Sequence, residues 1–159
     1  MNVEQVMTKN VSTCGPDDIL NTAARIMWES DCGCVPVVEA DGTGRLVGML
    51  TDRDISMAAY TRGRCLCDLS VKDAMAHAVV GCRPDDSIAA AESAMRKAQI
   101  RRLPVLDEEG HLLGLISLAD IACEAARERN SKRQEVSDAE VGQALSDICW
   151  PRPATPSGS

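Results

Sequence analysis

Apolar and polar positions follow a strand–helix pattern over the first sixty residues. A short extended piece at 11–14 stops at Pro-Asp-Asp, whose Asp pair is expected to cap the helix that follows. Apolar residues then recur at helical spacing over 20–27. Two apolar runs, 35–38 (VPVV) and 46–50 (LVGML), flank a Gly-rich turn and are typical of buried strands. With a second helix beginning at Thr51, the pattern predicts a β-α-β-β-α unit.

The same unit occurs a second time along the chain. Pro16 corresponds to Pro84 and Pro36 to Pro104, at a constant offset of 68 residues. Neither unit alone can bury much of a core, so the two are expected to pack together. The sequence therefore predicts an α/β (α+β) fold built from an internal repeat.

The repeat and the composition divide the chain into five segments. We expect a first motif at 1–60, a linker at 61–70, a second motif at 71–125, a polar linker and short amphipathic helix at 126–149, and a disordered Pro/Ser-rich tail at 150–159.

The short helix near the C-terminus has its own start signal. Ser137-x-x-Glu140 is a capping box, and an apolar stripe follows it. The stripe consists of Val141, Ala144, Leu145 and Ile148. Because a short isolated helix is marginal in water, it is expected to dock, either on its own domain or on a second subunit or partner.

The composition limits the classes of partner. The formal net charge is −7, and the chain has no Phe, one Tyr and two Trp, which argues against nucleic acid as the main partner. The first ten residues lack the apolar region of a signal peptide, and no run of about 18 apolar residues could span a membrane. We expect a cytoplasmic protein.

The eight cysteines are therefore expected to be reduced thiols. Cys14, Cys82 and Cys123 lie among apolar residues, which indicates small core side chains. Cys32-Gly33-Cys34 and Cys65-Leu66-Cys67 are more closely spaced than the C-x-x-C of zinc and redox sites. We favour core or incidental thiols and assign no metal ligand, but metal or redox chemistry stays an alternative.

In each unit, the second apolar run is followed by a hydroxyl residue and, three positions later, an aspartate: Thr51-x-x-Asp54 in the first unit and Ser117-x-x-Asp120 in the second. One interpretation is a helix capping box with Asp in place of Glu. The other is a nucleotide clamp, because a helix N-terminus favours phosphate and a carboxylate can accept hydrogen bonds from both hydroxyls of a ribose. The residues alone leave both interpretations open.

The ordered pattern M-T…P-D-D…A-A-x-x-M…V-P-V-V…G-x-L-x-G-x-L-T-D-R-D-I resembles the CBS motif, named after cystathionine β-synthase. Two copies resemble a CBS pair, or Bateman module, over about residues 1–125. The resemblance implies pseudo-twofold packing of the motifs, adenosine-type ligands with the Asp of T/S-x-x-D on the ribose, and a disc-like homodimer of CBS pairs.

The resemblance also implies two clefts shared between the motifs. In each, the ribose Asp of one motif faces the first strand and the pre-Pro-Val segment of the other. Cleft A comprises Met49, Thr51, Arg53, Asp54, Ala78, Val80, Ile100, Arg101 and Arg102. Cleft B comprises Thr8, Lys9, Asn10, Ser12, Cys32, Gly33, Cys34, Leu115, Ser117 and Asp120. Because cleft A carries three arginines, it is expected to be the stronger site.

The sequence thus predicts a regulatory module rather than an enzyme. It would bind AMP, ADP, ATP or a related adenosine derivative and signal by a change of conformation or association, with no required cofactor. A thiol-based redox or metal sensor and a ligand-free interaction module are the alternatives.

Overall fold

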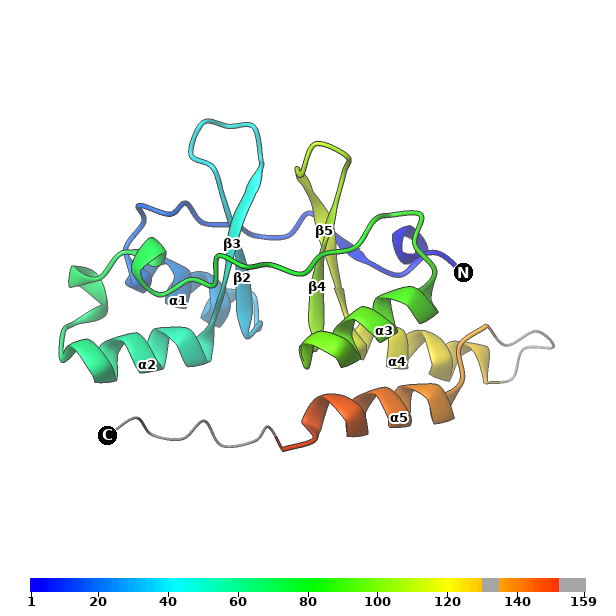
Figure 1. Ribbon diagram of the computed structural model, residues 1–159. Helices are drawn as coiled ribbons and strands as arrows, with labels where there is room; N and C mark the ends of the chain where they lie inside the picture. The colour runs from blue at the N-terminus through cyan, green and yellow to red at the C-terminus, as the bar shows by residue number, and fades with distance from the viewer. Residues whose placement is uncertain (130–134, 152–159) are drawn as a thin grey trace.

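Two lobes stand side by side in the computed structural model, which describes residues 1–129 and 135–151 (Figure 1). The first lobe contains α1 (Leu20–Glu29), β2 (Cys34–Val38), β3 (Leu46–Thr51) and α2 (Asp52–Arg62). The second contains α3 (Ile88–Ala98), β4 (Arg102–Leu106), β5 (Leu112–Ser117) and α4 (Leu118–Glu128). The predicted helix–strand–strand–helix order is therefore confirmed in both halves.

The strands of each lobe form an antiparallel hairpin. Cys34 lies opposite Thr51 in β2–β3, and Arg102 lies opposite Ser117 in β4–β5. The extended piece expected before each helix is reduced to one parallel bridge, Cys14 with Val37 in the first lobe and its counterpart in the second. These contacts bury Val35 and Val37 completely, together with the matching residues of β4.

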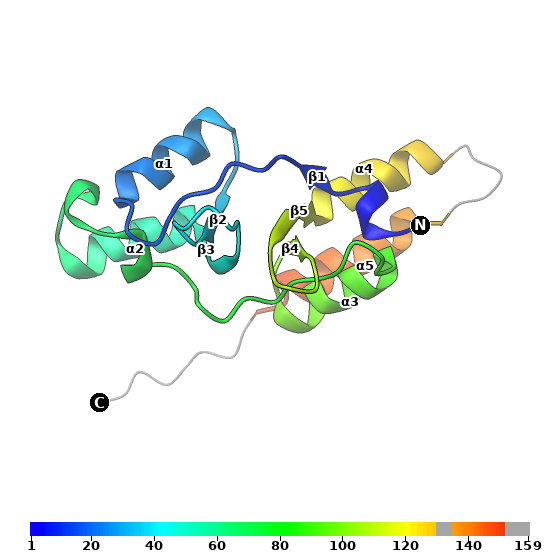
Figure 2. The same ribbon diagram turned by 90° about the horizontal axis from the view of Figure 1, so that it is seen from above.

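The two motifs exchange their first turns. The turn η1 (Val3–Gln5) lies against the second lobe, where the Val3 amide donates to the Asp86 carbonyl at 2.9 Å (Figure 2). The turn η3 (Val71–Asp73) lies against the first lobe, where the Val71 amide donates to the Asp18 carbonyl at 2.8 Å. Both valines are completely buried, each in the core of the other motif.

The same exchange continues into the sheets. β1 (Thr8–Lys9) pairs with β5, which gives the sheet order β1-β5-β4, and Met49 of β3 bridges to Ala76. Each crossing segment passes directly over a glycine. A Cβ on Gly114 would lie 2.5 Å from the Thr8 carbonyl oxygen, and one on Gly48 would lie 2.7 Å from the Met75 sulfur. The repeated glycine of the second strand is thus required by close approach of the exchanged chain.

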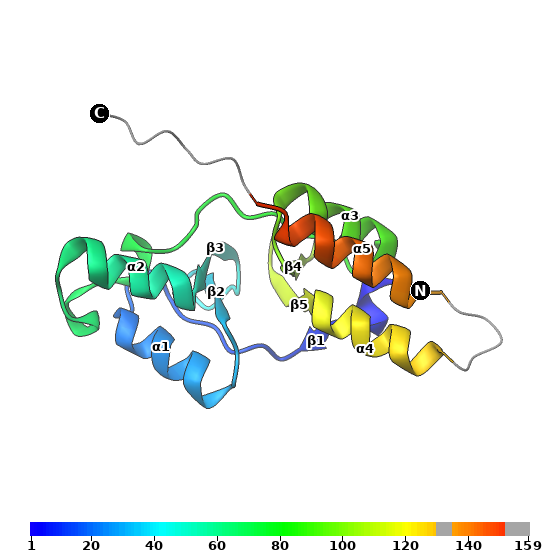
Figure 3. The same cartoon turned by 90° about the horizontal axis from the view of Figure 1, so that it is seen from below.

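The helix near the C-terminus, α5 (Asp138–Cys149), lies along α3 and α4 (Figure 3). Ala144 and Ile148 of the predicted stripe are buried in the second-lobe core, whereas Leu145 is 46% exposed. Of the docking sites that the sequence left open, α5 uses its own domain. Part of the expected polar linker (130–134) and most of the expected tail (152–159) lie outside the described residues.

The expected capping role of the Pro-Asp-Asp turns is wrong. Asp18 Oδ2 accepts a hydrogen bond from the Gly15 amide at 2.8 Å, three residues back, and so closes the turn before the helix. Asp86 does the same with the Arg83 amide at 2.7 Å. The N-cap residues are Ile19 for α1 and Ser87 for α3, and only Ser87 caps with its side chain.

The segment expected as a linker is partly core. Residues 61–70 include the turn η2 (Leu66–Asp68), and Leu69 is only 1% exposed.

Among the described residues, no helix is long and apolar enough to cross a membrane.

Candidate functional site

The two hydroxyl–carboxylate pairs form capping boxes with the same geometry. The amide and hydroxyl of Thr51 donate to Oδ2 of Asp54 at 2.9 and 2.7 Å, and the Asp54 amide donates back to Thr51 Oγ1 at 3.2 Å. Ser117 and Asp120 repeat these bonds at 2.8, 2.6 and 3.2 Å. The capping interpretation is confirmed at both positions. Since only Oδ2 takes part in the box, Oδ1 remains available as an acceptor for a ligand.

The N-terminus of α2 differs from the open anion site that was expected. The Asp52 amide donates to the Gly33 carbonyl at 3.3 Å, and the Arg53 amide donates to Oδ1 of Asp52 at 2.7 Å. With the Asp54 amide bound to Thr51, the first three amides of α2 all have acceptors. A phosphate here would therefore depend on arginine side chains, and would have to displace the Asp52 carboxylate to reach an amide.

Each capped junction is contacted by a segment near the start of the other motif. Met49 and Ala76 exchange two backbone hydrogen bonds of 3.0 and 2.8 Å. On the other side, Thr8 lies opposite Leu115. The chain that continues from each contact is exposed. It carries Ala78 and Val80 for cleft A, and Lys9, Asn10 and Ser12 for cleft B.

The hairpin register places the backbone of each pre-Pro-Val segment beside the capped junction of its own motif. Because each of these segments leads into the strand that pairs with its own motif's junction, Cys34 lies opposite Thr51 and Arg102 opposite Ser117. The Leu118 amide accordingly donates to the Arg101 carbonyl at 2.9 Å. By backbone position, Ile100–Arg102 lies beside Ser117, and Cys32–Cys34 lies beside Thr51.

The side chain of Arg102 nevertheless reaches across to the first motif. One of its terminal nitrogens lies 3.8 Å from the position of a Cβ on Gly33, and an Asp52 carboxylate oxygen lies 3.2 Å from the same position. Burial raises the pKa of Cys34, and the positive charge of Arg102 acts in the opposite direction. Arg102 thus places its charge beside the start of α2, while Arg53 and Arg101 are exposed.

Two hollows border these residues. One, of 460 Å³, lies between α1 and α2 and is lined by Ala24, Met27, Trp28, Asp31, Cys32, Gly33, Asp52, Ile55 and Ser56. The other, of 580 Å³, lies beside α3 and is lined by Val80, Ala90, Ser93, Ala94, Lys97 and Ala98. Of the predicted site residues, Cys32, Gly33 and Val80 line these two hollows. The α1–α2 wall was not predicted from the sequence; its Trp28, one of the two tryptophans of the chain, is 87% exposed.

The thiols divide into buried and exposed groups. Burial raises the pKa of both Cys14 and Cys82 to about 11, so these thiols are neutral at pH 7, as expected of core side chains. Cys123 is exposed, which corrects its expected core position, because it lies on the outer side of α4. Cys32 is half-buried and donates to the Cys34 carbonyl at 3.3 Å.

Comparison with known proteins decides the family. A model of the CBS domain matches the chain at residues 3–60 and again at 71–126. The chain belongs to the CBS-domain family. As a CBS protein it is 34% identical over 147 residues to the CBS domain-containing protein YhcV of Bacillus subtilis, covering 92% of this chain and 94% of that one.

Solved CBS structures share the fold. The structure of Hypoxic Response Protein I with two coordinated zinc ions is 32% identical, with a TM-score of 0.69 over 77% of this chain and 98% of that chain. The structure of CBSX2 in complex with AMP is 22% identical, with a TM-score of 0.71 over 81% and 98% of the two chains. The second likeness concerns the fold alone. The resemblance to a CBS pair is confirmed.

Proposed function

We propose that this CBS pair is a regulatory module that binds an adenosine-type nucleotide at the junction of its two motifs. The observation that carries the proposal is the reciprocal contact of each capped junction with the other motif, Met49 with Ala76 and Thr8 with Leu115. A ligand held there touches both lobes, so its binding energy depends on their relative position. The CBSX2 complex with AMP supports the ligand class.

Cleft A is the stronger site in this proposal. Asp54 Oδ1 accepts hydrogen bonds from the ribose hydroxyls while Oδ2 keeps the cap. Arg53 and Arg102 neutralise the phosphate, and they must outweigh the negative charge of Asp52. Cleft B offers Lys9 and, by backbone position, Arg101. The difference between the clefts is therefore smaller than the three arginines of the sequence indicated.

The test is a thermal-shift series followed by calorimetric titration. Adenosine, AMP, ATP and S-adenosylmethionine are compared with inorganic phosphate and GMP. A ligand at 100 times its dissociation constant adds about 2.7 kcal/mol to the free energy of unfolding. At least one adenosine derivative is expected to raise the melting temperature, and phosphate alone is not. Absence of any shift at millimolar concentration would overturn the proposal.

The proposal includes no catalytic step and no required cofactor, and it places the protein in the cytoplasm. CBS pairs are generally regulatory modules without catalysis of their own. The signal would pass through a change of shape or association to a protein target.

We further propose a homodimer that uses the hollow between α1 and α2. The internal repeat supports a second copy of the chain as the occupant of the hollow, because α5 covers the matching face of the second lobe. Glu92 and Arg96 of α3 lie near α5, and their counterparts in α1 are Ala24 and Trp28, which line the hollow. A second copy of the chain would cover this face of the first lobe, as α5 covers the matching face of the second lobe.

A metal- or redox-sensing role is the second candidate. It is supported by the zinc ions in the structure of Hypoxic Response Protein I and by exposed thiols at positions 65 and 67 of this chain.

A further inference from the structure

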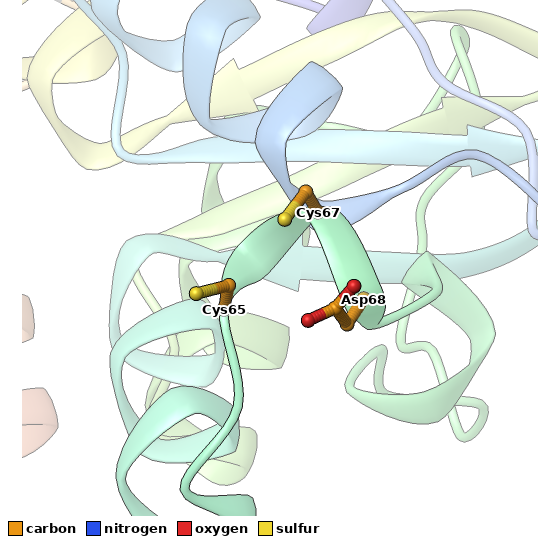
Figure 4. A group of neighbouring side chains, drawn as sticks. All are labelled: Cys65, Cys67 and Asp68. Carbon is orange, nitrogen blue, oxygen red and sulfur yellow. The ribbon is translucent and has the colours of Figure 1, made fainter.

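Three potential metal ligands gather on the turn η2, in the segment that leads from the first lobe to the second. They are the thiols of Cys65 and Cys67 and the carboxylate of Asp68, all exposed (Figure 4). Their ligand atoms lie within 4.8 Å of one another. Ligands of one tetrahedral ion, each about 2.0–2.3 Å from the metal, must lie this close together.

The backbone that carries these ligands is held in place by its apolar neighbours. Leu66 packs against the first-lobe core, and Leu69 is 1% exposed with its carbonyl accepting from the Leu20 amide at 2.8 Å. The Asp68 amide donates to the Cys65 carbonyl at 3.0 Å and closes the turn. The backbone of the turn is therefore held in place before an ion binds, which lowers the entropic cost of binding.

The local charge favours a cation. A bound dication stabilises two thiolates and a carboxylate together. Two sulfur ligands and one oxygen suit a borderline-soft ion such as Zn²⁺ better than Mg²⁺ or Ca²⁺, which prefer oxygen.

A second group of potential ligands, Asp107, Glu109 and His111, has a structural explanation. The Asp107 carboxylate accepts from the His111 amide at 2.8 Å and contacts the ring nitrogen Nδ1 at 2.9 Å. These bonds close the turn between β4 and β5, so this group serves as a control.

We propose that Cys65, Cys67 and Asp68 form a binding site for one Zn²⁺ ion, with two thiolates, one carboxylate and a fourth position open to water or another ligand. Binding displaces one proton from each thiol, so two protons are released per ion and no oxidation state changes. The site is separate from the nucleotide clefts, and its occupancy stabilises the turn that connects the lobes.

The experiment measures zinc binding by the full-length chain, stripped with a chelator and kept under a phosphine reductant. Zn²⁺ is titrated in competition with a chromophoric chelator. The wild type is expected to bind one equivalent of Zn²⁺ in competition with the chelator, and the double variant Cys65→Ser/Cys67→Ser is expected to lose this binding. The matched control Cys123→Ser/Cys149→Ser replaces two other exposed thiols and is expected to keep it, as is His111→Gln.

Cobalt substitution gives an independent readout. Co²⁺ is expected to produce a thiolate-to-metal charge-transfer band in the wild type and in both controls, and none in Cys65→Ser/Cys67→Ser. Asp68→Asn should keep the band but weaken Zn²⁺ binding at least about 10-fold, since even second-shell changes cost about 10- to 100-fold. Affinity should also fall as the pH is lowered, because protons compete for both thiols.

Two results would overturn the proposal. One is unchanged zinc stoichiometry and affinity in the Cys65→Ser/Cys67→Ser variant. The other is loss of binding in either control, which would place the ion elsewhere. Melting curves of all metal-free variants show whether the fold is intact. The substituted thiols at 65 and 67 are exposed, so matching curves are expected.

Discussion

At the scale of single residues, Asp54 and Asp120 are equivalent in the cap but not in their charged surroundings. Both hold a helix N-terminus through Oδ2 with nearly the same distances. Asp54, however, follows Arg53, and the Arg102 side chain lies near Gly33 beside Asp52 at the start of the same helix, whereas Asp120 follows Ala119. Capping therefore predicts equal effects of substitution at the two positions, and ligand binding predicts unequal effects.

Substituting each aspartate by alanine separates these roles. Asp54→Ala and Asp120→Ala should each lower the free energy of unfolding by roughly 0.5–2 kcal/mol through loss of the cap. Asp54→Ala should also weaken nucleotide binding about 10- to 150-fold, since a hydrogen bond to a charged group contributes roughly 1.5–3 kcal/mol. Calorimetric titration and melting curves of both variants measure the two effects. Equal, small affinity losses would count against cleft A.

Glu92 is a buried carboxylate at the contact between α3 and α5. It is 5% exposed, its Oε1 has no hydrogen-bond partner among the described residues, and the charged groups that face it are Glu140 of α5 and Arg96 of α3. Burial, followed by the charge of Glu140, raises its pKa. Because the folded state holds the proton more tightly than the unfolded state, the fold is favoured at low pH. This contribution is lost as the pH rises through the folded-state pKa.

Glu92→Gln should therefore stabilise the protein at neutral pH. The glutamine amide still lacks partners but is uncharged. Because an unsatisfied charged group costs more than the roughly 1–3 kcal/mol of a neutral one, a gain of about 1 kcal/mol is expected. The gain should be larger at pH 8 than at pH 5. Thermal unfolding of both proteins at the two pH values provides the comparison, and a pH-independent difference would contradict the expected burial of charge.

At the scale of elements, α5 is stabilised by one side of its apolar stripe. Ile148 is 8% exposed in the second-lobe core, and Leu145 of the same helix is 46% exposed. The helix is otherwise held by polar contacts at the surface, such as Arg96 with Asp147 at 3.5 Å. Surface ion pairs contribute little, so the apolar contacts should dominate.

Ile148→Ala should accordingly destabilise the protein by about 2–4 kcal/mol, through lost burial and a residual cavity. Leu145→Ala, the matched control, should change stability by less than about 0.5 kcal/mol. Urea unfolding of both variants gives the difference. Similar losses in the two would mean that α5 uses its outer face as well.

The crossing segments make a second element-scale prediction. A Cβ on Gly114 would meet the backbone of Thr8, which cannot rotate away, so Gly114→Ala should cost about 1–3 kcal/mol by overpacking. Gly142, in the middle of α5, has no atom within 4 Å of an added Cβ, so Gly142→Ala should instead stabilise by about 0.5–1 kcal/mol. Denaturation midpoints distinguish the two. A neutral Gly114→Ala would show that the β1–β5 contact is loose.

At the scale of the whole molecule, the two lobes depend on each other. Val3 fills the core of the second lobe and Val71 that of the first, so neither motif has a complete core by itself. The lobes differ at their helical faces. α5 covers α3 and α4, and the hollow between α1 and α2 exposes Trp28.

Self-association is the prediction at this scale. Sedimentation at micromolar concentration should give a dimer of the 17.0 kDa chain. Trp28→Glu should shift it to monomer, because a charge in an apolar contact remains unpaired. Tyr60→Glu is the control, since Tyr60 is 81% exposed on α2 and does not line the hollow. A wild type that sediments only as 17.0 kDa would contradict the dimer.

The sequence by itself determined the repeated helix–strand–strand–helix order, the capping boxes at Thr51, Ser117 and Ser137, and the apolar stripe of α5. All of these depend on hydrogen bonds and periodicities within a few residues, which local sequence encodes.

Tertiary structure alone decided the exchange of the first turns, the hairpin register that pairs Cys34 with Thr51 and Arg102 with Ser117, and the docking of α5 on its own domain. The exchange and the docking join segments tens of residues apart. Swapping the turns between two similar motifs would preserve the same local pattern, so no local signal distinguishes the alternatives. Tertiary packing shows which one is formed: the exchanged arrangement buries Val3 and Val71 completely and brings the chain across Gly48 and Gly114.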